Sequence, residues 1–307
     1  MNQPRELRIG TRRSALAMAQ AGAVRAALVR AWERGPVSLV PVVTAGDRSQ
    51  SRDDLLPEGR GAFVRELDRA LVRGDVDVCV HSAKDVPSEL APGLAWAGCP
   101  PRGDARDALA GGPYRSLGEV PPGSTLATGS PRRVAQLRAL RPDLRFAPIR
   151  GNVDSRLDRV GGSGFAAAVL AVAGLVRVGR AAEIREVWST DLVVPAAGQG
   201  ALFLVARAED APVLSVLAAL CDPVTTWAVA AERAVLSTLG GGCDLPVGVY
   251  AAPTAAGWSL SSVLADTDGG LVGVHVRTPS ADTDLDSAVA LGQRCAAALV
   301  AGLGKER

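Results

Sequence analysis

Over roughly its first two hundred residues, the sequence alternates short apolar runs with longer segments whose apolar residues recur every three to four positions. The short runs have the length of buried strands, and the longer segments have the period of helices packed on one side. This alternation is typical of an α/β fold with much parallel sheet. We expect strands at 7–9, 39–43 and 76–80, with helices at 14–34 and 63–73.

The same alternation resumes after the run CPPRGD at 99–104, which we interpret as a linker. The polar stretch 44–61 has no periodicity, and we interpret it as a mobile loop. A turn-rich run at 195–200 precedes one more strand. In this second part we expect strands at 125–127, 145–148, 166–171 and 201–205, and helices at 131–140 and 153–160.

After Cys221 the pattern changes to that of a small α+β domain. Asp222 is a suitable N-cap and Pro223 a suitable first residue for a helix that continues to about Leu239. Three strand-like stretches and a final helix follow, at 247–251, 259–264, 271–276 and 285–303.

Composition narrows the class of protein. The chain has 307 residues, 48% of them apolar, which favours two or three packed domains over disorder. A net charge of +2 and few aromatic residues argue against nucleic-acid binding. Charges interrupt every long apolar stretch and the N-terminus has no apolar signal core, so we expect no membrane span and a cytoplasmic protein. Five scattered cysteines and two distant histidines predict neither disulfides nor a structural metal.

Two segments of the sequence resemble each other. RIGTRRSALAMAQ and LATGSPRRVAQLR each place a strand, a polar turn and an arginine pair at the start of a helix. Exposed amides, a positive helix end and guanidinium groups together suit a carboxylate or phosphate. Arg150, Arg156 and Arg177 follow downstream, and no phosphate-binding loop accompanies them. If the two units face each other, these arginines predict a cleft for a polycarboxylate; alternatively, each one is a solvated surface residue.

The segment VDVCVHSAKDVPS runs from a buried strand into a turn. It places His81, Ser82, Lys84 and Asp85 at the carboxyl end of that strand, where catalytic residues of α/β proteins are common. A carboxylate there can stabilise positive charge or transfer protons. An ordinary Lys–Asp turn pair, with His81 in the core, explains the same pattern.

Cys243 lies in LGGGCDLPV, between a predicted helix and a predicted strand. Three glycines permit a tight backbone and the close approach of a bulky group. Cys243 is therefore the best of the five cysteines for a covalent link, although a buried, inert thiol is the more common role of a cysteine.

Eight segments, in order across nearly the whole chain, resemble the hydroxymethylbilane synthase family, also called porphobilinogen deaminases. They are IGTRRSALA, HSAKDVP, TGSPRR, IRGNVDSR, LAVAGLVRVG, PAAGQGAL, AAERAVL and GGGCDLPVG. The resemblance implies two similar α/β domains like those of periplasmic binding proteins, plus a small α+β C-terminal domain. The expected boundaries are 1–100 with 200–220, 104–195, and 221–307.

The resemblance also implies an activity. A family member is a transferase of porphyrin, heme and other tetrapyrrole biosynthesis that condenses four porphobilinogen molecules head to tail onto a dipyrromethane cofactor. Ammonia leaves at each step, and hydrolysis then frees hydroxymethylbilane. We expect porphobilinogen as the only partner, no nucleic acid or membrane, and a monomer.

Matching the family motifs residue by residue gives the expected site. Asp85 matches the catalytic acid, and Cys243 matches the thioether-linked cysteine. Further cofactor contacts are implied for Ser82, Lys84, Thr128, Ser130, Arg132, Arg133, Asn152 and Gly174. Substrate contacts are implied for Arg12, Ser14, Arg60, Phe63, Arg150, Arg156, Arg177 and Gln199.

Two positions depart from the family pattern: Arg60 stands where the family often has lysine, and Asp244 follows the cysteine. Two rival interpretations stay open. One is a non-catalytic, two-lobed binding protein for a small polycarboxylate, which leaves the glycine-flanked Cys243 unexplained. The other is an inactive paralogue that still binds the cofactor.

Overall fold

The computed structural model describes residues 5–42, 61–160, 162, 164–240, 245–266, 270–278 and 284–303, with only the backbone at 61–63. The chain forms two compact units, residues 1–102 with 201–226 and residues 103–200 with 227–307. The predicted third domain falls largely within the second unit, so the division into three domains stays a prediction.

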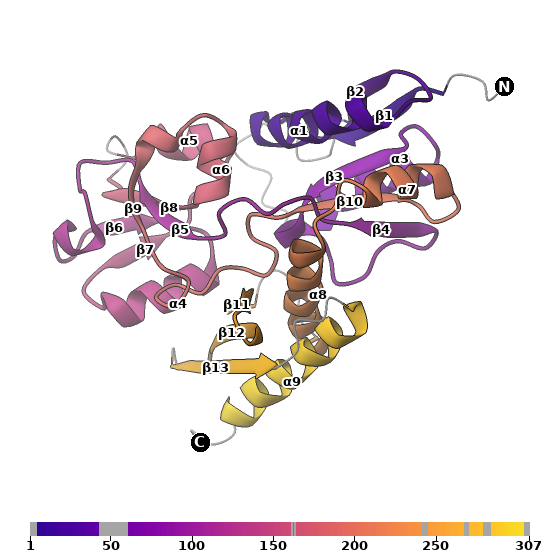
Figure 1. The fold of residues 1–307 in the computed structure, drawn as a ribbon. Helices are drawn as coiled ribbons and strands as arrows, with labels where there is room; N and C mark the ends of the chain where they lie inside the picture. The colour runs from indigo at the N-terminus through magenta and orange to yellow at the C-terminus, as the bar shows by residue number, and fades with distance from the viewer. Residues whose placement is uncertain are drawn as a thin grey trace. The chain divides into compact units, whose positions relative to one another are not determined.

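The described strands of the first unit form one mixed sheet in the order β2-β1-β3-β10-β4. β1 is parallel to β2 and β3, as the sequence predicts, whereas β10 runs antiparallel to β3 and β4. Figure 1 labels the helices and strands of this unit: β1 (Leu7–Thr11), α1 (Ala15–Ala31), β2 (Val37–Pro41), α3 (Gly61–Val72), β3 (Val78–Ser82), β4 (Leu94–Gly98), β10 (Leu202–Arg207) and α7 (Ala211–Ala218). A 3-10 turn, η1 (Ala83–Asp85), follows β3.

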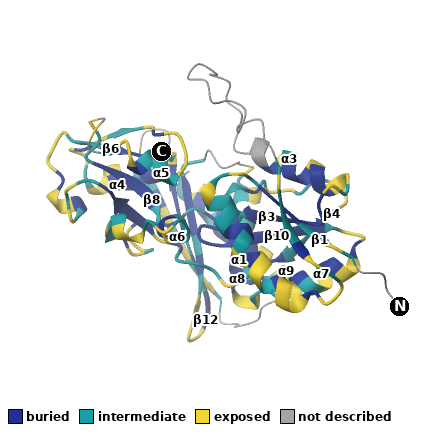
Figure 2. Ribbon diagram, turned by 90° about the horizontal axis from the view of Figure 1, so that it is seen from above, coloured by how far each residue is buried: buried dark blue, intermediate teal, exposed yellow. Residues whose placement is uncertain are grey.

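Alternation along the strands gives this sheet two different faces. Leu7, Ile9 and Leu204 pack in one core with α1 and α7. Cys79 lies on the opposite face, where its thiol donates to the carbonyl of Leu67 on α3. The central strands β3 and β10 are thus buried, dark blue in Figure 2, and only their ends can present side chains to a ligand.

The second unit repeats the strand order of the first in β7-β6-β8-β5-β9. β6 is parallel to β7 and β8, and β5 runs antiparallel to β8 and β9. The internal resemblance between the β1–α1 and β6–α4 segments therefore reflects equivalent places in two sheets. The elements are β5 (Asp107–Ala110), η2 (Leu117–Glu119), β6 (Thr125–Ala127), α4 (Pro131–Leu140), β7 (Arg145–Ala147), α5 (Val153–Leu157), β8 (Ala167–Ala171), α6 (Val172–Arg177), η3 (Ala181–Glu183) and β9 (Ile184–Val187).

The C-terminal part contains an antiparallel sheet, β11-β12-β13, together with α8 and α9. Asp222 caps α8 as predicted, because its carboxylate accepts from the backbone N–H of Thr225 at 2.8 Å. Trp227 and Trp258 stack at 3.9 Å between ring centroids. The bounds are α8 (Pro223–Thr238), β11 (Val247–Thr254), β12 (Gly257–Ala265), β13 (Leu271–Thr278) and α9 (Leu285–Leu303).

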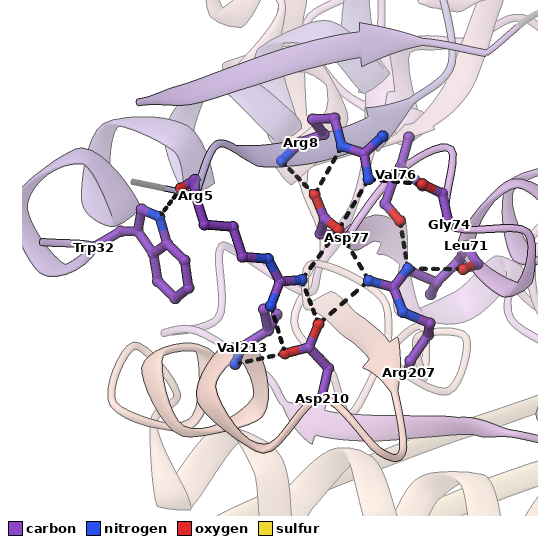
Figure 3. Close-up of polar contacts among 10 residues, drawn as sticks. All are labelled: Arg5, Arg8, Trp32, Leu71, Gly74, Val76, Asp77, Arg207, Asp210 and Val213. Atoms are coloured by element: carbon purple, nitrogen blue, oxygen red, sulfur yellow. Dashed lines mark hydrogen bonds and ion pairs between the residues drawn. The ribbon is translucent and has the colours of Figure 1, made fainter. Parts of the chain in front are cut away.

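A charge network joins β1, the start of β3 and the β10–α7 turn (Figure 3). Asp77 accepts from the Arg8 side chain at 3.0 Å and from Arg207 at 2.9 Å. Arg5 links Asp77 to Asp210, which also caps α7. The network links β10, which comes late in the sequence, to the N-terminal strands. It does so at the end of the sheet opposite the predicted site.

Asp77 gives the first unit a specific response to acid. Burial alone would raise its pKa, but hydrogen bonds from Arg8 and Arg207 outweigh burial and lower the pKa from 3.8 to about 2. A carboxylate with a lowered pKa stabilises the fold above its unfolded pKa, and this stabilisation is lost as the pH falls from about 4 to about 2. Asp77→Asn should therefore lower the free energy of unfolding by about 2 kcal/mol at pH 7.

Urea unfolding of both proteins at pH 7 and near pH 2.5 measures this effect. The difference between wild type and Asp77→Asn should shrink at the lower pH. Asp75→Asn is the matched control, because that carboxylate is half exposed and pairs only with Arg73 among the described residues. An equal difference at both pH values would contradict the assignment.

Candidate active site

The predicted residues of the first unit gather at one edge of its sheet. β1 and β3 are parallel neighbours, so the residues that follow their carboxyl ends emerge side by side. Arg12 and Ser14 follow β1, whereas Lys84 and Asp85 form η1 directly after β3. Ser82 is the last residue of β3.

Two serines at this edge have structural partners. Ser14 caps α1, its hydroxyl accepting from the Ala17 backbone N–H at 3.3 Å. Ser82 accepts from the Gln20 side-chain amide at 2.9 Å. Gln20 is a buried α1 residue that the sequence analysis missed, and it fixes the end of β3 against α1.

Asp85 is half-buried, and its carboxylate forms no hydrogen bond or ion pair with any described residue. Other aspartates of the chain are used differently: Asp77, Asp107 and Asp210 all bind arginines. The Asp85 carboxylate is thus available to a ligand at the carboxyl end of a central strand.

The second unit presents its predicted residues at the corresponding edge. β6 lies between β7 and β8, and all three are parallel. Thr128–Arg133 follow β6, and residues 150–156 follow β7. Gly174 and Arg177 lie on α6 directly after β8.

The short polar side chains at this edge differ in whether their hydrogen-bonding groups are already used within the protein. Thr128 is buried, and its hydroxyl accepts from the Ser130 backbone N–H at 3.3 Å. Ser130 stands at the N-cap of α4 but makes no capping bond through its hydroxyl. Asn152 caps α5 through its side-chain oxygen, bound by the Ser155 N–H at 2.8 Å, which leaves its amide group available.

Arg150 and Arg156 occupy different environments at the β7–α5 turn. The Arg150 guanidinium is exposed, with no hydrogen-bond or ion-pair partner among the described residues. Arg156 donates to the Gly151 carbonyl at 2.8 Å, which orients its guanidinium beside the start of α5. Both residues suit an anionic ligand that approaches from solvent.

Arg132 and Arg133 lie in a buried cluster instead of standing open to solvent. Their exposed fractions are 3% and 7%, and both bind Asp107 at 2.7 Å. Burial would raise the pKa of Asp107, but the attraction of the two guanidinium groups lowers it well below its usual range. Asp107, which the sequence analysis missed, holds both guanidinium groups in fixed positions.

Gln199 and Arg177 connect the same cluster to the segment that follows β9. The Gln199 amide donates to Asp107 at 2.9 Å and to the Ala105 carbonyl at 2.7 Å, and the side chain is 1% exposed. Arg177 donates to the Gly200 carbonyl at 2.6 Å, and burial lowers its pKa. Their roles in substrate binding stay predictions.

Glu232 on α8 is a second buried acid that the sequence analysis missed. Its carboxylate accepts from the backbone N–H of Gly198 at 2.6 Å and of Ala251 at 2.9 Å. Because Gly198 adjoins Gln199, the hydrogen bonds of Glu232 connect the Asp107 cluster to β11. The AAERAVL segment thus contributes a buried carboxylate that holds these two backbone segments together.

Several of the predicted site residues are not among the residues that the structure describes. Arg60, Cys243 and Asp244 lie outside the described residues, as do the Phe63 side chain and most of the predicted loop 44–61. Within the described residues no group of three His, Cys, Asp or Glu side chains could hold a metal ion. No single described helix is long and apolar enough to cross a membrane; α7 and α8, bent by 106°, meet that test only together.

Comparison with known proteins identifies the family. Residues 7–215 match the model for the dipyromethane cofactor binding domain of porphobilinogen deaminase, and residues 226–301 match its C-terminal domain. The porphobilinogen deaminase of Acidothermus cellulolyticus is 45% identical over 304 residues, 96% of this chain and 88% of that protein. That of Albidiferax ferrireducens is 44% identical over 97% of this chain and 94% of that protein.

Solved structures give only distant likenesses. The methionine binding protein MetQ has a TM-score of 0.43 at 16% identity, with 71% of this chain and 90% of that chain covered. A periplasmic substrate-binding protein from Coxiella burnetii has a TM-score of 0.44 at 14% identity, with 74% and 96% covered. The fold assignment therefore rests on sheet topology, and the family rests on the sequence matches. The chain belongs to the porphobilinogen deaminase family.

Proposed function

We propose that this chain is a hydroxymethylbilane synthase that condenses four porphobilinogen molecules head to tail onto a dipyrromethane primer linked to Cys243, releases ammonia at each step and then hydrolyses the product free. The observation that carries the proposal is the available Asp85 carboxylate at the end of β3. We place the reaction in the cytoplasm and expect a monomer on the family resemblance alone.

The donors of the second unit fit a cofactor that carries several carboxylates. As a set, Arg132, Arg133 and Asp107 have a net positive charge, and all three are buried. The Ser130 hydroxyl is not used to cap α4. Guanidinium and hydroxyl donors at a helix start are the groups that bind carboxylates well. Dipyrromethane, when bound, would supply the nucleophilic pyrrole carbon to which the first porphobilinogen unit is joined, and each later unit would be joined to the ring added before it.

Asp85 would act on the porphobilinogen nitrogens. Positive charge develops on the substrate when ammonia leaves, and a fixed carboxylate stabilises it more strongly at a half-buried site than in water. The same carboxylate can take up the proton that each coupling releases. Arg12, Arg150 and Arg156 would bind the acetate and propionate groups of the growing chain.

Intact-protein mass, followed by peptide mapping, tests the covalent link. Protein from a host that makes porphobilinogen should carry an added mass of two linked pyrroles on Cys243, and Cys243→Ala should lack it. Cys221→Ala is the matched control: its half-buried thiol has a pKa raised to about 12 by burial and by Asp222, so the adduct should persist. Unmodified wild-type protein would instead favour the non-catalytic binding protein.

A further inference from the structure

A buried carboxyl group and an imidazole face each other close to η1 (Ala83–Asp85), the turn that carries Asp85 and is called the catalytic turn below. Asp68 on α3 and His81 on β3 are 6% and 5% exposed. Asp68 Oδ1 and His81 Nε2 are 3.6 Å apart, and neither atom has a hydrogen-bond partner among the described residues. A hydrogen bond would require about 2.7–3.2 Å, so the pair is about half an ångström from direct bonding.

The surroundings of the pair are mostly apolar. Phe203 lies opposite His81 in the antiparallel register of β10, and Trp96 stacks on Phe203 at 4.8 Å. Cys79, two residues before His81, has a pKa raised by burial and by the negative charge of Asp68. Arg65 and Arg69 line, with Asp68, a groove of about 310 Å³ outside α3, but neither lies within ion-pair distance of Asp68.

Stability does not account for this arrangement. A buried polar group without a hydrogen bond destabilises a fold, and apolar side chains of similar volume would fill the space between α3 and β3 at lower cost. What the polar pair offers instead is a contact with a preferred direction. A carboxylate attracts an imidazole N–H along one direction, so the pair defines the distance between α3 and β3 at one point more narrowly than apolar packing would.

The contact between Asp68 and His81 lies next to the catalytic turn. His81 is the penultimate residue of β3, and η1, with Lys84 and Asp85, begins two residues later. Gln20 holds Ser82 from the α1 side of the sheet, whereas Asp68 faces His81 from the α3 side. The last two residues of the strand thus have polar partners on opposite faces, Ser82 through a hydrogen bond and His81 through a carboxylate 3.6 Å away.

We propose that Asp68 and His81 are a positioning pair. Their contact fixes the position of the carboxyl end of β3 between α1 and α3, and thereby the position of the Asp85 carboxylate relative to its substrate. Neither residue touches the substrate. This inference rests on the proposed function of Asp85. A misplacement of about 1 Å at a catalytic group can cost as much as 10²-fold in rate.

Steady-state kinetics of the full-length holoenzyme test the proposal. Asp68→Asn, which keeps the shape of the side chain, should lower kcat for porphobilinogen consumption about tenfold, with KM within about twofold and the cofactor content unchanged. His81→Gln should cause the same loss. The double variant should lose no more than either single variant, because both substitutions break one contact.

Asp75→Asn, in the connection between α3 and β3, is the matched control, and its kcat should stay at the wild-type value. If Asp68→Asn does not fold, the kcat and KM of His81→Gln alone decide the matter. A lower melting temperature with wild-type kcat would reduce the pair to a packing role and overturn the proposal, as would additive losses in the double variant. A wild-type protein without turnover would instead contradict the proposed function.

Discussion

Asp85→Asn should slow porphobilinogen consumption by about 10²- to 10⁴-fold while the protein stays folded. Asparagine keeps the size of the side chain but removes the negative charge and the ability to accept a proton. Because Asp85 makes no hydrogen bond or ion pair with the described residues, its replacement breaks no structural contact. The measurement is the rate of porphobilinogen consumption by protein whose mass shows the attached cofactor.

Glu89→Gln provides the comparison for Asp85→Asn. Glu89 is an exposed carboxylate four residues further along, outside the 3-10 turn. Its replacement removes the same charge from nearly the same region and should leave turnover unchanged. Near-normal turnover in Asp85→Asn would refute the catalytic role, and equal losses in both variants would indicate a general charge effect instead.

Asp107→Asn should lower the free energy of unfolding of the second unit by about 3–5 kcal/mol. Asp107 is fully buried and accepts hydrogen bonds from Arg132, Arg133 and Gln199. The neutral amide would leave two buried guanidinium groups without a counter-charge from this position. Because the cost comes from buried positive charges that lose their counter-charge, it should be far larger than the cost of losing one hydrogen bond.

Chemical unfolding at neutral pH measures the Asp107 effect. Asp143→Asn is the control in the same unit, where Asp143 pairs with Arg141 near the surface. That exposed pair should change stability little, because solvent already screens it. A similar small loss in both variants would show that the Asp107 cluster is not the anchor of the second unit.

The elements with a strong local signal were predictable from the sequence. The helices 131–140 and 285–303 have the predicted bounds, because Pro131 marks the first and a sustained helical period the second. β4, β5 and β9 were missed. They are short strands whose assignment depends on antiparallel pairing with segments distant in the chain, and no local pattern reveals such pairing.

The same distinction separates the predicted site residues from those that were missed. Within each sheet the predicted residues could be grouped, those after β1 and β3 in the first unit and those after β6 and β7 in the second, because the carboxyl ends of parallel strands share one edge of their sheet. Asp107, Gln20 and Asp68 could not be found this way. Each meets a partner on a different element, at a distance that depends on how the two elements pack together.

The place of β10 in the first sheet constrains the order in which the two sheets can be completed during biosynthesis. β10 lies between β3 and β4, yet a ribosome makes it only after residues 103–200 are complete. Until then the emerging N-terminal chain exposes two strand edges with no partner, the kind of edge that pairs wrongly with other chains. The sheet that begins first is therefore completed after the β7-β6-β8-β5-β9 sheet, and a nascent chain halted before Leu202 leaves β3 without its neighbour β10.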